Sequence, residues 1–219
     1  MKSDYDYKSK KTFYNGVDYR SILEARWAVF FDLLSIPFNY EKEYYEVEAG
    51  CRVIWYKPDF YLPEINKYIE IKPRKPKDDE LTKAAGWCED IGDIVVLFDL
   101  NPPKENTESG WLFKLHNSIR QPKLKATLFK SFWWCECPRC GKIDLCQYGE
   151  LECGCFSFEE FNQIYTQEEE KSFRTYPKFE HAPRLLTAYK IAKNIKFVNK
   201  QKVEPILYNS TIWQNNNVK

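Results

Sequence analysis

The residues best suited to chemistry lie in one short stretch, residues 57–72, which reads KPDFYLPEINKYIEIK. One acid, Asp59, directly follows a proline, and a second acid, Glu70, stands two positions before a lysine, Lys72. Paired carboxylates beside a lysine can bind a divalent cation and activate water for attack on a phosphodiester. The alternative is a solvated hairpin with a polar outer face.

A hairpin that turns about Glu64 and Ile65 would bring these three side chains together. Its antiparallel register places Asp59 opposite Glu70, and directly opposed residues share a face. Lys72 lies two positions further along and shares that face as well. The opposite face would carry the apolar residues Phe60, Leu62, Ile69 and Ile71. The register that buries the apolar set therefore also gathers the polar set.

Two carboxylates about 4 to 5 Å apart repel each other, and a cation is the usual remedy. Mg²⁺ takes oxygen ligands from one or two carboxylates together with water and phosphate. A neighbouring lysine can orient the attacking water and offset the charge that builds on the phosphorus centre. We therefore predict that Asp59 and Glu70 bind Mg²⁺ or Mn²⁺ and that both, together with Lys72, are catalytic.

The elements that position this stretch can be predicted from hydrophobic periodicity and from turn residues. In chain order they are a helix at residues 20–34, strands at 38–47, 52–62 and 68–72, a helix at 78–92 and a strand at 93–98. The last strand is a short apolar run, which is typical of a strand buried on both faces. The order α-β-β-β-α-β predicts an α/β (α+β) protein with a mixed sheet.

The sequence resembles the signature of the PD-(D/E)xK nuclease superfamily at Pro58-Asp59 and, after a gap, at Glu70-Ile71-Lys72. The core of that superfamily has the same αβββαβ order. The resemblance covers roughly residues 13–100, and the segment YRSILEARWAVFFDLLSIPFNYEKE is similar to small phage and bacterial members. It implies a restriction-endonuclease-like core and a metal-dependent DNA nuclease, with endonuclease activity favoured over exonuclease activity.

The superfamily also places an acid on its first helix, and Glu24 matches that position. The resemblance implies that Glu24 is catalytic and a further ligand of Mg²⁺. A capping box is the alternative, in which Ser21 begins the helix and Glu24 accepts a backbone N–H. The metal role is expected if the helix begins before Ser21, with Asp18 as the rival N-cap.

Basic side chains suggest two surfaces for the DNA backbone. Beside the site we expect Arg20, Arg74 and Lys75, which would contact DNA phosphates without recognising the base sequence. The acids at 78–80 are expected to stabilise the N-terminus of the next helix. The formal net charge is only +1, yet basic residues dominate from position 171 onward. A helix predicted at 183–198 presents Lys190, Lys193 and Lys196 to DNA. The alternative for each residue is a solvated surface charge.

A second metal site is predicted from cysteine spacing. CPRCG is a zinc-knuckle turn, and CGC follows after twelve residues. The four predicted ligands of a structural Zn²⁺ are Cys137, Cys140, Cys153 and Cys155. This segment resembles a zinc ribbon, but ribbons normally end in a second Cys-x-x-Cys, so Cys135 and Cys146 are rival ligands. Cys51 and Cys88 stand alone and are expected to be small buried hydrophobes.

The whole chain has 219 residues, of which 43% are hydrophobic and 30% charged, as is ordinary for globular proteins. Three parts are predicted: a nuclease-like domain at 1–110, a zinc-ribbon-like module at 125–160 and a basic helical extension at 161–219. No run of about 18 apolar residues and no signal-peptide core is visible. We expect no membrane association and a cytoplasmic location in a bacterium or a phage-infected host cell.

These observations together predict a metal-dependent DNA nuclease. Its expected partners are DNA and, as one alternative, a second copy of the chain in a homodimer. The competing function is a non-catalytic DNA-binding or inhibitory protein of phage type on the same scaffold. Cleavage assays with and without divalent metal would separate the two.

Overall fold

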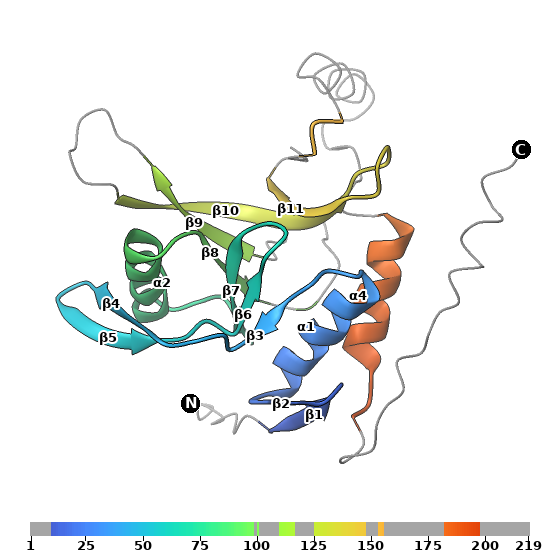
Figure 1. The fold of residues 1–219 in the computed structure, drawn as a ribbon, viewed down its shortest axis with the longest axis horizontal. Coiled ribbons are helices and arrows are strands. Elements are labelled where there is room, and N and C mark those ends of the chain that lie inside the picture. The colour runs from blue at the N-terminus through green and yellow to red at the C-terminus, as the bar shows by residue number, and fades with distance from the viewer. Residues whose placement is uncertain are drawn as a thin grey trace, which may run out of the picture.

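The computed structural model of the chain describes residues 10–98, 100, 110–116, 125–147, 153–155 and 182–197. Its helices are α1 (Ile22–Leu33), α2 (Asp78–Asp90) and α4 (Pro183–Asn194). Its strands are β1 (Thr12–Tyr14), β2 (Val17–Tyr19), β3 (Asn39–Tyr40), β4 (Tyr45–Ala49), β5 (Arg52–Tyr56), β6 (Phe60–Leu62), β7 (Lys67–Lys72), β8 (Ile94–Phe98), β9 (Gly110–His116), β10 (Lys125–Glu136) and β11 (Ile143–Gln147). Figure 1 shows this mixed α and β architecture.

Seven strands form one curved sheet in the order β11-β10-β9-β8-β7-β6-β3. Strands β7 and β8 are parallel and are joined through α2, whereas the other neighbouring pairs are antiparallel. The hairpins β1–β2 and β4–β5 pair outside this sheet. The predicted α/β class with a mixed sheet is confirmed. The narrower assignment to a restriction-endonuclease-like core stays a prediction.

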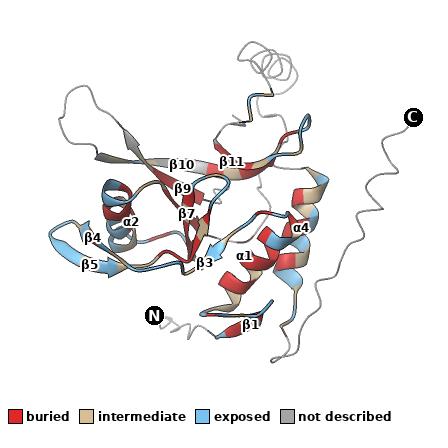
Figure 2. Ribbon diagram, in the orientation of Figure 1, coloured by how far each residue is buried: buried red, intermediate tan, exposed pale blue. Residues whose placement is uncertain are grey.

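Both faces of the sheet are covered, which gives two hydrophobic cores (Figure 2). Helices α1 and α4 pack side by side on one face, against Phe60 of β6 and Trp134 of β10. Helix α2 covers the other face, where Trp87 packs with Val96 of β8 and Val47 of β4. All five residues of β8 are buried, as its apolar run predicts.

Two predicted strands are each divided in the structure. The strand predicted at 38–47 becomes β3, in the main sheet, and β4, in an outer hairpin. The strand predicted at 52–62 becomes β5 and β6 in the same way, with Lys57, Pro58 and Asp59 between them. Proline offers no N–H for a sheet ladder, which favours a break at this point.

The β4–β5 hairpin is held firmly on α2 although it lies outside the main sheet. Tyr45 and Tyr56 pack edge-on against Trp87, with ring centroids 5.2 and 5.5 Å away. A Cβ atom at Gly86 would lie only 2.0 Å from the carbonyl oxygen of Glu48, so helix and hairpin approach as closely as glycine allows. The hairpin is therefore a fixed projection beside the sheet.

Strand β10 joins the predicted nuclease-like and zinc-ribbon-like parts. It pairs with β9 through residues 125–132 and with β11 through residues 132–136. The cysteine-bearing strand pair thus extends the main sheet, and the predicted division at 110–125 stays a prediction. The predicted C-terminal helix is confirmed as α4, which ends at Asn194, while 161–181 and 198–219 of the predicted extension lie outside the described residues.

A helix that crosses a lipid bilayer needs about 20 residues. The longest helix in the described ranges has 13 residues, and none there could cross a membrane.

Candidate functional site

Asp59 and Glu70 are positioned by the register of one hairpin. Strands β6 and β7 pair Phe60 with Ile69 and Leu62 with Lys67, which is the predicted register. Extended by one position beyond the Phe60–Ile69 pair, the same register would place Asp59 opposite Glu70. The backbone N–H of Ile71 donates to Asp59 Oδ2 at 2.7 Å, and Asp59 is only 2% exposed. The sheet itself therefore fixes this carboxylate.

A guanidinium group neutralises Asp59 from the loop that precedes α1. Arg20 Nη2 lies 2.6 Å from Asp59 Oδ1, and Arg20 Nε lies 2.5 Å from Glu41 Oε1. Burial raises the pKa of Asp59 well above its ordinary value, and the negative charges of Glu70 and Glu24 raise it further. The Ile71 N–H and the Arg20 guanidinium oppose this rise in pKa and stabilise the charged form of Asp59.

Glu70 and Lys72 form the second half of the site. Lys72 Nζ lies 2.6 Å from Glu70 Oε1 and 3.8 Å from Glu80 Oε1. Burial works to lower the pKa of Lys72, but the adjacent Glu70 carboxylate outweighs it and the pKa is raised. Glu70 is 7% exposed, and its Oε2 atom is buried without a hydrogen-bond partner. This oxygen is therefore the less satisfied of the two carboxylate oxygens of Glu70.

Glu24 adopts the capping arrangement. Helix α1 begins at Ile22, and Ser21 is its N-cap, with the Glu24 N–H donating to Ser21 Oγ at 3.1 Å. The Glu24 carboxylate accepts the hydroxyls of Ser21, at 2.7 Å, and Tyr40, at 2.5 Å, and the backbone N–H of Arg20 at 3.2 Å. The expectation that the helix begins before Ser21 is wrong. A role for Glu24 at a metal stays a prediction.

The three carboxylates, Glu24, Asp59 and Glu70, do not form a ready cation cage. In the described part of the chain, the one group of metal-ligating side chains close enough to hold an ion is made of cysteines. Carboxylate oxygens are nonetheless the ligands that Mg²⁺ prefers, and the unpartnered Oε2 of Glu70 fits such a role. In this geometry Arg20 and Lys72 supply the positive charge beside Asp59 and Glu70.

The Glu70–Lys72 pair faces a cavity of about 440 Å³ between β5, β7 and the first turns of α2. Trp55 of β5 also lines it and is 70% exposed, while Lys83 of α2 lines it as well. The charged residues of the lining are two lysines, Lys72 and Lys83, and three acids, Glu70, Asp79 and Glu80. The Glu70–Lys72 pair therefore opens onto a cavity that has charges of both signs and an aromatic wall.

Sequence reasoning missed three contributors to this site. Glu80 accepts the backbone N–H of Lys77 at 2.7 Å, as a helix-capping acid does, but it also approaches Lys72. Tyr56 lines the cavity, and burial together with the charge of Glu70 raises its pKa well above the usual value. Trp55 lines it too. No sequence signal pointed to either aromatic residue, because RVIWY is apolar at four of its five positions.

The predicted DNA-contacting residues fall into two places. Arg20 lies in the site, and Arg74 pairs with Glu80 at 2.7 Å, while the Lys75 ammonium lies 6.0 Å from the centroid of the Trp111 ring. The C-terminal lysines lie elsewhere. Lys190 and Lys193 are exposed on α4 and Lys196 just beyond it, and α4 packs against α1 and β10 (Figure 1). The structure does not bring this second group to the Asp59–Glu70 site.

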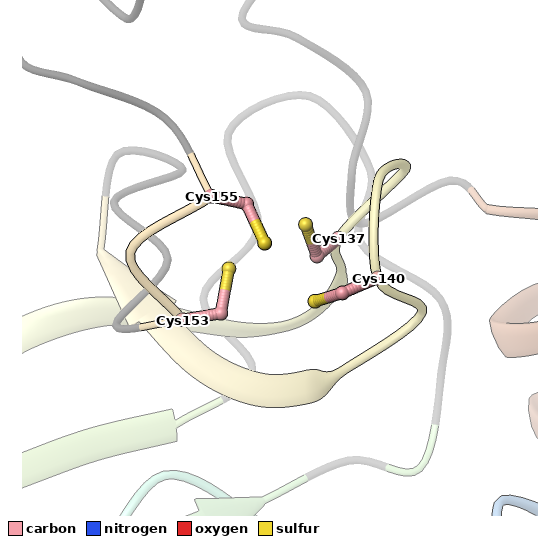
Figure 3. Close-up of side chains that lie close together, drawn as sticks. All are labelled: Cys137, Cys140, Cys153 and Cys155. Atoms are coloured by element: carbon pink, nitrogen blue, oxygen red, sulfur yellow. The ribbon is translucent and has the colours of Figure 1, made fainter.

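The four predicted zinc ligands are brought together (Figure 3). The sulfur atoms of Cys137, Cys140, Cys153 and Cys155 all lie within 4.8 Å of one another. The knuckle turn is closed by two backbone hydrogen bonds of 2.8 Å, from the Gly141 N–H to the Cys137 carbonyl and from the Cys137 N–H to the Lys142 carbonyl. Gly141 has a positive φ of 70°, which glycine adopts freely. This cluster could hold a metal ion such as zinc.

The knuckle also favours thiolate at its first cysteine. Burial works to raise the pKa of Cys137, but the backbone N–H groups of Cys140 and Arg139 stabilise the thiolate and bring the pKa down to about 7. Cys135 and Cys146, the rival ligands, are buried in β10 and β11 and are not members of the cluster. Cys88 is buried as expected, but Cys51 is exposed in the turn between β4 and β5, so that expectation is wrong for Cys51.

Comparison with known proteins adds no relative. No family model matches the sequence, and no curated protein or solved structure gives a significant match.

Proposed function

We propose that the protein is a Mg²⁺- or Mn²⁺-dependent nuclease that hydrolyses phosphodiester bonds in DNA. The observation that carries the proposal is the β6–β7 register, which aligns Asp59 opposite Glu70 and sets Lys72 beside an open cavity. That cavity also contains an exposed tryptophan, Trp55, at its wall. The spacing of these residues along the sequence is the one that resembles the PD-(D/E)xK signature.

Each residue has a distinct part in this proposal. Asp59 and the free Oε2 of Glu70 would hold the metal, which when bound lowers the pKa of water and stabilises the leaving oxygen. Lys72 donates to Glu70 in the free protein and would turn one N–H towards the attacking water or the phosphate. Arg20 balances the buried Asp59 until substrate arrives. Glu24 orders the start of α1 beside Asp59.

The cysteine cluster would hold structural zinc under the same proposal. Four protein ligands leave no open coordination position, so the zinc would fold the chain and would not take part in hydrolysis. Its contribution is to fix the turn that joins β10 to β11 at the edge of the main sheet.

Cleavage of defined DNA substrates tests the proposed activity. Purified full-length protein is incubated with plasmid, single-stranded and branched DNA in Mg²⁺, in Mn²⁺ and after addition of EDTA. We expect products in Mg²⁺ or Mn²⁺ and none in EDTA. Binding without any cutting in either metal would refute the nuclease.

One observation favours the second candidate, a non-catalytic DNA-binding or inhibitory protein. Arg20 and Lys72 already neutralise Asp59 and Glu70 at 2.6 Å each, so the site is electrostatically balanced without a metal. A protein of this kind would bind DNA equally well with and without divalent ions. The same assay separates the two functions.

The exposed Trp55 provides a test of where the DNA lies. We expect Trp55→Ala to weaken DNA binding about tenfold or more, because stacking of a base on an aromatic ring contributes about 1–3 kcal/mol. Val53→Ala is the matched control, since Val53 is 60% exposed, lies on the same face of β5 and does not line the cavity. Fluorescence anisotropy with single-stranded and duplex DNA measures both. Equal affinities for the two variants would remove Trp55 from the DNA surface.

A further inference from the structure

We infer that a second cavity, across α1 from the Asp59–Glu70 site, binds a phosphate group of the DNA backbone. This cavity, of about 560 Å³, lies between the β1 segment, α1 and residues 195–197. Its cationic lining is Lys10, Lys11, Arg26 and Lys196, and Asp18 is its one acidic lining residue in the described part of the chain. Phosphate binding follows from this charge, whereas DNA as its source rests on the proposed function.

The lining of the cavity is strongly positive, and no described carboxylate pairs with its cations. Four cations face a single carboxylate, and no described carboxylate forms an ion pair with any of the four. The Nε atom of Arg26 is buried without a hydrogen-bond partner. A buried donor on a charged group is costly to leave unpaired, so an oxyanion seated there would stabilise it.

The walls of the cavity come from well-packed elements. Ile22 and Arg26 lie one turn apart on the same face of α1. Across the cavity, the Phe197 ring meets Tyr14 of β1 edge-on with centroids 6.1 Å apart, which holds residues 195–197 against the β1–β2 hairpin. Segments that are far apart in the sequence are thus fixed around one group of cations.

Phosphate is the ligand that suits this lining. A guanidinium group offers donors in a fixed fork that matches phosphate oxygens, and lysines add mobile point charges. The cavity volume falls within the usual range for ligand sites, about 300–1,000 Å³, so a phosphate with its attached sugar would fit. A sequence-independent set of cations of this kind positions a nucleic-acid backbone and does not read bases.

The cavity and the Asp59–Glu70 site lie on different sides of α1. On α1, Arg26 faces the cavity while Glu24, two residues earlier, faces Tyr40 and the Asp59 side. A strand bound at the Asp59–Glu70 site would have to pass around α1 to reach this cavity, where Lys196 would have a defined place in binding.

Anion binding by charge variants tests the inference. Full-length protein is titrated with a fluorescein-labelled 20-nucleotide duplex in Ca²⁺ over a series of salt concentrations, and separately with inorganic phosphate by calorimetry. Arg26→Gln combined with Lys196→Ala should weaken DNA binding about tenfold or more at 0.1 M salt, and should flatten the slope of log affinity against log salt by about two units. Asp18→Asn should strengthen DNA binding, because it removes the one acid from the same lining.

Unfolding can only weaken DNA binding, so a gain of affinity in Asp18→Asn together with a loss in the double variant cannot come from loss of folding. Arg26→Lys should retain most of the affinity because it keeps the charge. Changes confined to the inorganic phosphate titration would overturn DNA as the source of the phosphate. An unchanged salt slope in the double variant would overturn the backbone contact. This experiment measures binding and not cleavage, so a negative result in the separate cleavage assay would refute the nuclease and leave the cavity's role intact.

Discussion

Lys72→Ala is expected to lower the rate of DNA cleavage by about 100-fold or more at saturating Mg²⁺, with little change in DNA affinity. Lys72 is half-buried and its ammonium lies beside Glu70 at the cavity. Groups that move protons or stabilise developing charge typically contribute about 10²–10³-fold to a rate. Single-turnover cleavage of a labelled duplex measures the rate, and anisotropy in Ca²⁺ measures the affinity.

Asp59 requires a gentler substitution than alanine. Its carboxylate accepts the Ile71 N–H and pairs with Arg20, so truncation would leave two buried partners unsatisfied and cost about 1–3 kcal/mol of stability. Asp59→Asn keeps the volume and an acceptor for Ile71 while it removes the charge that a metal needs. We expect it to be as defective in cleavage as Lys72→Ala.

Lys67→Ala is the matched control for the lysine variant. Lys67 belongs to the same strand, β7, but lies at its other end and is 6% exposed. Its loss weakens packing without touching the site, so this variant should unfold at a lower temperature and still cleave. Full cleavage by Lys72→Ala, or equal loss in both lysine variants, would contradict a catalytic role for Lys72.

Loss of the proposed zinc ion should lower the thermal midpoint of unfolding by about 10 °C or more. Structural zinc contributes directly to folding, and for a chain of this size each kcal/mol shifts the midpoint by about 2–4 °C. Cys140→Ser should reduce the zinc content from about one ion per chain to well below one. Mass spectrometry of the metal and differential scanning calorimetry measure the two quantities.

Cys146→Ser provides the matched control for the cluster. Cys146 is buried in β11, next to the knuckle, but is not a member of the group of four. It should keep its zinc and lose only the small amount of stability that a buried thiol supplies. A wild-type protein without zinc, or loss of zinc from Cys146→Ser but not from Cys140→Ser, would exclude the assigned ligands.

The local geometry of the site could be predicted because short-range patterns determine it. The turn at residues 63–66 and the alternation on both sides of it fix the β6–β7 register, and this register is confirmed. The knuckle is similarly local, since a proline, a glycine and two cysteines define its turn. In both places the hydrophobic pattern and the turn residues agree, so few other arrangements are consistent with them.

Features that depend on distant contacts were predicted less well. The division of two strands at residues 41–44 and 57–59 accompanies the docking of β4 and β5 onto Trp87. Pro58 is a local signal for the second break, but no local pattern reveals the docking. The pairing of β10 with β9 is equally hidden, because a strand's partner is decided by the whole sheet. The role of Glu24 could not be predicted either, since this residue matches both a capping box and the acid that the PD-(D/E)xK superfamily places on its first helix.

The path of β10 through the sheet has a consequence for work with shortened versions of the protein. A fragment that ends at residue 110 would lose β9 and β10, and the apolar strand β8 would become a bare sheet edge. Unpaired edges of flat, apolar strands recruit other chains and promote aggregation. Insolubility of such a fragment would then reflect the missing neighbour of β8 and would say nothing about the Asp59–Glu70 site.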